Sequence, residues 1–88
     1  MEKEEFPPLC PDFVVDLRSR SDSLAALREK MREYLTNGAR LGWLIDPIDR
    51  RVYVYEPPDG ETCFEDPESL SGEPVLRGFV LEPRRLWA

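Results

Sequence analysis

The 88-residue chain carries a formal net charge of −6 and contains two cysteines and no histidine. A chain of this length forms one small domain, which buries only about 60% of the surface that its unfolded form exposes. Isolated cysteines without histidine exclude a zinc site. The absence of histidine and of a Gly-rich phosphate loop excludes the commoner hydrolase and deaminase designs.

The charge is unevenly distributed along the chain. Residues 17–51 carry a net charge of +3, whereas the remaining residues carry −9. One side of the fold could therefore be basic and suited to phosphate groups, although the alternative is an ordinary surface of mixed charge. No apolar run is long enough to span a bilayer, and the first residues lack the features of a signal peptide. We therefore expect a cytoplasmic protein without a membrane partner.

Residues 1–10 are predicted to form an extended leader, because the prolines around them disfavour a helix. A first strand is then predicted over residues 13–18, within FVVDLR. Asp16 lies among apolar residues of this strand. A carboxylate there is costly unless it is paired, hydrogen-bonded or bound to a metal. Asp16 is therefore the first candidate for a functional residue.

A helix is predicted next, with Ser21, Asp22 or Ser23 as its N-cap and Asn37-Gly38 at its end. Its apolar stripe has three- and four-residue spacing and consists of Leu24, Leu27, Met31, Tyr34 and Leu35. Lys30 lies at the border of this stripe. Its amine could reach around the helix toward the sheet, or it could be an ordinary surface lysine.

A second buried strand is predicted over residues 41–45, which completes a right-handed βαβ unit. Functional residues in such units lie at the carboxyl ends of the strands, and here those ends carry Asp16, Arg18 and Asp46. Asp46 precedes proline and is most simply a turn former. Trp43 and Trp87 are predicted to belong to the core.

The remaining chain is predicted to extend the sheet. Residues 52–55 favour a strand antiparallel to the preceding one, and residues 61–65 could form a short edge strand. We expect a loop over residues 66–74 and a last strand or apolar strap over residues 75–81. Residues 83–88 are predicted to dock Leu86 and Trp87 on the core.

The spacing of the charged residues leaves two interpretations open. Asp16 and Arg18 are two residues apart and therefore share a face of their strand. This spacing occurs in metal-dependent phosphodiesterases, where the acid holds Mg²⁺ and the cation contacts the phosphate. The spacing alone favours the other interpretation, a structural ion pair. Asp12 lies four residues before Asp16, roughly 13 Å away on an extended strand, too far for both to hold one ion.

The segments PDFVVDLRS, SDSL, KMREY, NG and LGWLIDP together resemble the Uma-type family of restriction endonucleases, a branch of the PD-(D/E)XK nuclease superfamily. The resemblance extends through RVYVY to SGEPVLRGF. It implies an α/β fold with a mixed β-sheet and a crossover helix. It also implies cleavage of DNA with Mg²⁺ or Mn²⁺ as cofactor, and association into dimers.

The resemblance also implies roles for single residues. Asp16 matches the family's metal-binding strand carboxylate, usually Glu, and Lys30 matches a lysine on the following helix that acts near the scissile phosphate. Arg18 occupies the usual position of that lysine and would contact phosphate. Asp12 matches the acid that opens the strand and is the second candidate metal ligand. Arg20 departs from the family pattern, which has proline at this position.

The resemblance implies that this chain corresponds to the C-terminal half of a longer fold, because family members are roughly twice its length. Two hypotheses follow. The first is a Mg²⁺-dependent DNA endonuclease domain, which we expect to be inactive as an isolated chain unless a second copy or a partner chain completes it. The second is a non-catalytic interaction module that dimerises through an uncovered sheet edge.

Overall fold

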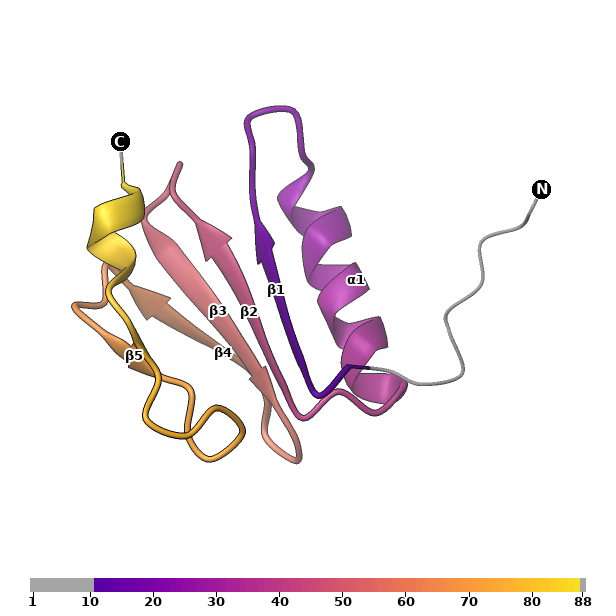
Figure 1. The fold of residues 1–88 in the computed structure, drawn as a ribbon. Helices are drawn as coiled ribbons and strands as arrows, with labels where there is room; N and C mark the ends of the chain where they lie inside the picture. The colour runs from indigo at the N-terminus through magenta and orange to yellow at the C-terminus, as the bar shows by residue number, and fades with distance from the viewer. Residues whose placement is uncertain (1–10, 88) are drawn as a thin grey trace.

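The computed structural model describes residues 11–87, so the predicted leader over residues 1–10 and the last residue lie outside the described residues. The elements are β1 (Phe13–Leu17), α1 (Leu24–Thr36), β2 (Leu41–Asp46), β3 (Arg51–Glu56), β4 (Gly60–Glu65), β5 (Leu70–Ser71), β6 (Val80–Leu81) and the 3-10 helix η1 (Pro83–Leu86). Figure 1 shows their arrangement. The predicted mixed α/β fold with a crossover helix is confirmed.

The main sheet has the strand order β1-β2-β3-β4. β1 and β2 are parallel and joined by α1, while β3 and β4 continue as antiparallel hairpins. The parallel register places Asp16 opposite Leu44 and Leu17 opposite Ile45. The carboxyl ends of β1 and β2 therefore meet at one end of the sheet, as the βαβ pattern predicts.

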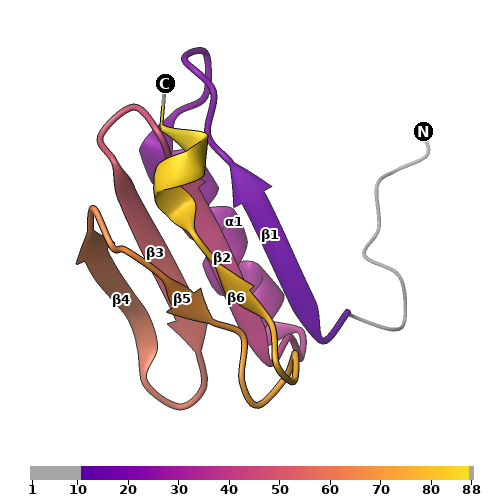
Figure 2. The same cartoon turned by 60° about the vertical axis from the view of Figure 1, so that its left-hand side comes forward.

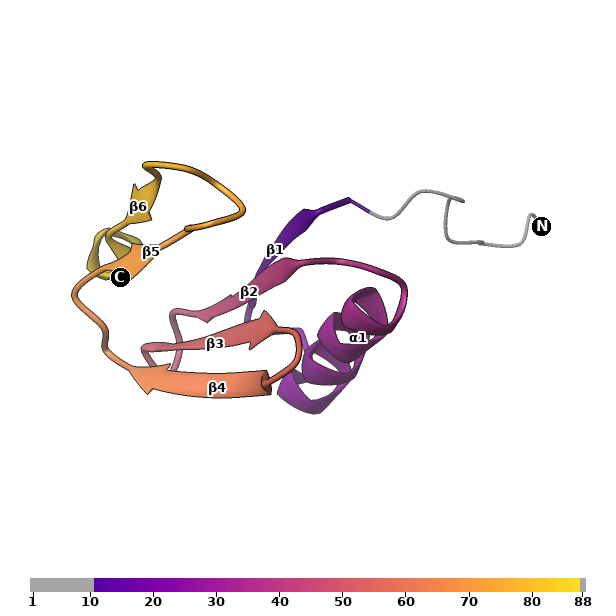
Figure 3. The ribbon, with the colours of Figure 1, turned by 90° about the horizontal axis from the view of Figure 1, so that it is seen from below.

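The sheet is covered on both faces, which explains why every residue of β2 is buried. Met31 of α1 packs on one face against Leu44, Tyr53 and Tyr55. The opposite face carries a second cluster, which consists of Leu41, Trp43, Ile45, Val52 and Leu70. Viewed from below, α1 lies on one side of the sheet and the β5–β6 ribbon on the other (Figure 3).

Local sequence explains where α1 begins and how closely it packs. The Ser23 hydroxyl accepts a hydrogen bond from the Ala26 N–H at 3.2 Å, so Ser23 is the N-cap among the three candidates. Gly38 follows the helix with a positive φ of 110°. A Cβ at Gly42 would lie 2.8 Å from the Met31 methyl carbon, so glycine at this position lets α1 approach β2 closely.

The C-terminal third differs most from the prediction. The expected loop over residues 66–74 contains β5, and only Val80–Leu81 of the expected last strand pairs with it. Trp87 packs against the core, as predicted. Leu86 is 40% exposed, so the prediction that Leu86 docks on the core is wrong. Two-residue strands are too short to leave a periodic signal in the sequence. Within residues 11–87, no helix has the length and apolarity that a membrane crossing requires.

Candidate active site

Asp16 and Lys30 meet at one spot beside the sheet. Asp16 is in β1, and Lys30 precedes Met31, which anchors α1 on the sheet. The Lys30 Nζ atom lies 3.4 Å from an Asp16 carboxylate oxygen. The Lys30 side chain is 50% exposed and that of Asp16 is 28% exposed. The expectation that Lys30 reaches around the helix toward the sheet is therefore confirmed, and both groups remain accessible to a ligand.

Arg18 makes a different contact from the one that its spacing suggests. Its Nη1 atom donates to Asp46 Oδ2 at 2.9 Å and to Asp49 Oδ2 at 3.4 Å. The hydrogen bond that Arg18 donates to Asp46 raises the pKa of Arg18. The interpretation of Asp16 and Arg18 as a structural ion pair is therefore wrong. Arg18 follows directly on Leu17, which lies opposite Ile45, so the parallel register brings Asp46 beside it.

Asp46 is a fully buried carboxylate with several partners. Besides Arg18, its Oδ1 atom accepts hydrogen bonds from the backbone N–H groups of Ile48 at 3.0 Å and Asp49 at 3.3 Å. Its predicted role as a turn former is confirmed. Its burial and its pairing with Arg18 were not predicted. A signal was available, because Asp46 ends a strand whose other residues are apolar.

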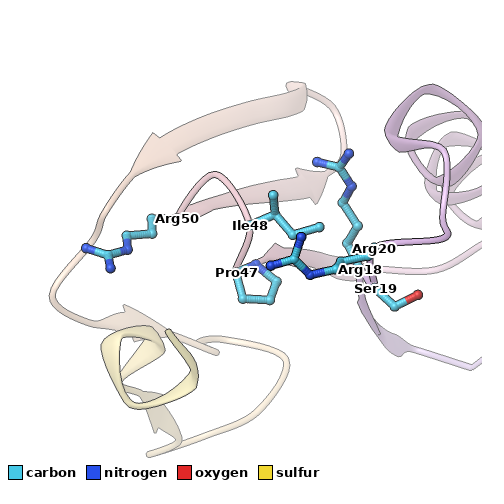
Figure 4. Close-up of a pocket in the computed structure, with 6 residues that line it drawn as sticks. All are labelled: Arg18, Ser19, Arg20, Pro47, Ile48 and Arg50. Atoms are coloured by element: carbon cyan, nitrogen blue, oxygen red, sulfur yellow. The ribbon is translucent and has the colours of Figure 1, made fainter. Parts of the chain in front are cut away.

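A shallow pocket opens at the carboxyl ends of β1 and β2. Its volume is about 360 Å³, and its lining consists of Arg18, Ser19, Arg20, Pro47, Ile48 and Arg50. Figure 4 shows the Arg20 and Arg50 guanidinium groups pointing away from one another at its margin. Three arginines around one opening favour negatively charged groups, although Asp46 and Asp49 already pair with Arg18. The positive charge of this pocket therefore lies mainly at its rim, on Arg20 and Arg50.

A second ion-pair cluster joins α1 to β4, and the sequence analysis did not identify it. Arg28 donates to both carboxylate oxygens of Glu61, at 2.9 and 2.6 Å. The Tyr55 hydroxyl also donates to Glu61, and the Arg28 guanidinium lies 5.1 Å from the centre of the Tyr53 ring. Hydrogen bonds from Arg28 lower the pKa of Glu61 to about 2. Burial is the main cause that raises the pKa of Tyr55. This cluster fixes the helix on the sheet.

The predicted metal site requires ligand side chains that lie close to one another. Among residues 11–87, no three histidine, cysteine, aspartate or glutamate residues lie close enough to hold a metal ion. Mg²⁺ is often held by one or two carboxylates together with substrate phosphates and water. Asp16 fits one such ligand. Asp12 is exposed and precedes β1, where its carbonyl accepts from the N–H groups of Arg40 and Leu41. Its role as a ligand stays a prediction.

Comparisons with known proteins point to one family. A family model described as "Uma2: Putative restriction endonuclease" matches residues 2–84. A solved structure of "a putative nuclease belonging to DUF820" from Anabaena variabilis ATCC 29413 is similar at a TM-score of 0.73 and 27% identity. The match covers 86% of this chain and 43% of that chain, so this chain spans less than half of that relative. A search of curated proteins found no match.

The family match includes both residues of the Asp16–Lys30 pair and the whole main sheet. The similar solved structure supports the same α/β nuclease fold. The chain therefore belongs to the Uma2 family of restriction endonuclease-like proteins.

Proposed function

We propose that this chain carries the catalytic carboxylate and lysine of a Mg²⁺- or Mn²⁺-dependent DNA endonuclease. The observation that carries this proposal is the 3.4 Å approach of Lys30 to Asp16 at the carboxyl end of β1. A carboxylate and an ammonium group that are both accessible provide a metal ligand and a cation at one position. Family membership supports the same class of reaction.

The two side chains divide the chemistry between them. Asp16 would hold the divalent cation, which supplies activation of water and neutralisation of charge at the phosphate. The Lys30 ammonium group would stabilise the negative charge that develops on the phosphoryl oxygens. Its charge is available because its contact with Asp16 is half-exposed, so a phosphate oxygen can replace the carboxylate as its partner.

The basic side chains near this pair support a nucleic acid as the substrate. Arg18, Arg20 and Arg50 line the pocket at the same end of the sheet. Residues 17–51 have a net charge of +3 within an acidic chain. Cations of this kind bind the phosphate backbone without reading its sequence. We propose that Arg18 lines the path of the DNA backbone while Asp46 holds it in place.

The proposal is tested by nicking of supercoiled plasmid DNA at high protein concentration, with Mg²⁺ or Mn²⁺. At concentrations at which a second copy can complete the site, we expect nicking that Asp16→Asn reduces by about 1,000-fold, equivalent to about 4 kcal/mol of activation free energy. Asp59→Asn is the matched control, because Asp59 is an exposed aspartate in the turn between β3 and β4, away from the candidate site. Equal activity of the two variants would contradict the role of Asp16. Absence of nicking by the unchanged chain would favour the non-catalytic interaction module.

A further inference from the structure

The helix α1 is attached to both outer strands of the main sheet, one on each of its flanks. Within residues 11–87, β1 and β4 are the outer strands, and Figure 2 shows them at the two sides of the sheet with α1 behind it. On one flank, Lys30 contacts Asp16 of β1. On the other flank, Arg28 contacts Glu61 of β4. Because each helical residue adds about 100°, Arg28 lies about 60° to one side of the buried Met31 and Lys30 about 100° to the other. Rotation of the helix about its axis therefore moves both cations together.

The attachment to β4 has the more restricted geometry. Arg28 donates from Nε and Nη2 to the two carboxylate oxygens of Glu61, at 2.9 and 2.6 Å. Two parallel charge-assisted hydrogen bonds fix the direction of a guanidinium group as well as its position. The attachment to β1 is a single contact of 3.4 Å between the half-exposed Lys30 and Asp16. Lysine has a flexible stem and lacks the rigid donor fork of arginine, so this contact restricts the helix less.

Buried tyrosines of β3 support the pair of Arg28 and Glu61, which we call the Arg28–Glu61 clamp. The Tyr55 hydroxyl donates to the carboxylate of the clamp. The centre of the Tyr53 ring lies 5.1 Å from its guanidinium group. Both tyrosines are almost fully buried in a packed sheet, so neither can follow a moving helix. A rotation of α1 would therefore break the paired hydrogen bonds of the clamp.

We propose that Arg28 and Glu61 are positioning residues for the Lys30 amine, which they place by fixing the rotation of α1 on the sheet. A side-chain tip about 6 Å from a helix axis moves by about 1 Å when the helix rotates by about 10°. A displacement of about 1 Å is sufficient to slow catalysis strongly. The inference rests on the proposed function, in which this amine stabilises charge on the phosphate.

The clamp matters most when a phosphate has replaced Asp16 as the partner of Lys30. The contact with β1 is then lost, and the helix is held by the clamp and by its apolar stripe. Arg28 and Lys30 both lie in the central turns of α1, where the backbone hydrogen bonds of a helix are complete. The short, stiff segment between them therefore transmits the position of the clamp to the amine.

A double-mutant cycle in the plasmid nicking assay separates positioning from a general effect. Glu61→Gln keeps the shape of the side chain but removes its charge. We expect it to lower kcat about 5- to 10-fold and to leave KM for DNA unchanged. In a Lys30→Ala background the same change should have no further effect, because the amine that the clamp places is absent. Equal reductions in the two backgrounds would overturn the proposal.

Leu70→Val is the matched control for stability. Leu70 is buried in the cluster on the opposite face of the sheet from α1, and the substitution removes one buried methylene. It should destabilise the chain to an extent comparable with Glu61→Gln, but it should leave nicking unchanged well below the melting temperature. Circular dichroism establishes that both variants are folded. Equal loss of nicking in the two variants would show that the effect comes from stability, and would overturn the proposal.

The orientation of α1 can be measured without an activity assay. Residual dipolar couplings of the backbone amides report the rotation of the helix relative to the sheet. We expect Glu61→Gln to rotate α1 by at least about 10°, which moves the amine by about 1 Å. Asp16→Asn removes the contact on the other flank and should leave α1 in place, because the clamp holds it. An unchanged orientation in Glu61→Gln, or equal rotation in both variants, would overturn the inference.

The two measurements distinguish failure of this inference from failure of the proposed function. If Glu61→Gln rotates α1 but the unchanged chain does not nick DNA, the proposed function is contradicted and the placement of the amine by the clamp stands. If nicking depends on Lys30 but is unaffected by Glu61→Gln, the proposed function stands. In that case Lys30 reaches the phosphate without the clamp, which overturns the inference.

Discussion

Two pairs of opposite charge lie near the carboxyl ends of β1 and β2, and they differ in how accessible their carboxylates are. Asp16 and Lys30 are 28% and 50% exposed, whereas Asp46 and Arg18 are 0% and 18% exposed. The buried pair is also shorter, 2.9 Å against 3.4 Å, and Asp46 accepts two further backbone hydrogen bonds. A carboxylate paired with a cation therefore occurs both in a structural contact and in a candidate site.

The physical basis of this difference is solvation. A carboxylate without water must keep its protein partners, because an unpaired buried charge is costly. A half-exposed pair gains little from its contact, since water stabilises the separated groups almost as well. Asp16 and Lys30 can therefore exchange one another for a metal ion and a phosphate, while Asp46 and Arg18 cannot. Substitutions at Asp46, Glu61 and Lys30 test this difference.

The largest effect on stability is expected at Asp46. Asp46→Ala removes the partner of Arg18 and the two hydrogen bonds that shape the turn, so unfolding free energy should fall by about 3 kcal/mol. Asp16→Ala should change it by less than about 0.5 kcal/mol, as at other accessible positions. Urea unfolding monitored by tryptophan fluorescence measures both. If the two variants lost equal stability, burial would not be what separates the two pairs.

An intermediate effect is expected at Glu61, whose contact with Arg28 is partly buried. The folded pKa of Glu61 is lowered from 4.5 to about 2, first by hydrogen bonds from Arg28. Its stabilising contribution is therefore present above pH 4.5 and is lost as pH falls toward 2. Melting temperatures measured across this range should fall more steeply for the unchanged chain than for Glu61→Gln.

At neutral pH, Glu61→Gln should lower the melting temperature by about 4–8 °C, which corresponds to roughly 1 kcal/mol for a domain of this size. Glu29→Gln is the control, because Glu29 forms only an exposed contact with Arg32. Parallel pH curves for the Glu61 variant and the unchanged chain would show that this carboxylate does not couple stability to pH.

The smallest effect on stability is expected at Lys30, where a difference should be seen in activity instead. Lys30→Ala should alter unfolding free energy by less than about 1 kcal/mol, because its contact with Asp16 is half-exposed. It should reduce plasmid nicking by about 10- to 100-fold through loss of a cation at the phosphate. Lys30→Arg should retain part of the activity. A large loss of stability with unchanged nicking would show that Lys30 stabilises the fold and does not act at the phosphate.

Several features of the molecule were predictable because they depend on neighbouring residues. Short apolar runs located β1 and β2, helical periodicity located α1, and the polar residues before α1 indicated its N-cap. The helical position of Lys30, at the border of the apolar stripe, predicted that its amine could reach the sheet. Asp16 was identifiable because a carboxylate within an apolar strand conflicts with the pattern around it.

The tertiary structure alone decided which partner each charged group has. Arg18 pairs with Asp46 and Arg28 with Glu61, and in both pairs the two residues are widely separated in sequence. Strand register and helix docking bring these residues together, and many registers are compatible with the same local pattern. Local sequence patterns are therefore sufficient to predict the βαβ unit and the candidate acid and amine. Which ion pairs are buried and which are accessible follows only from the packing, because burial depends on every element at once.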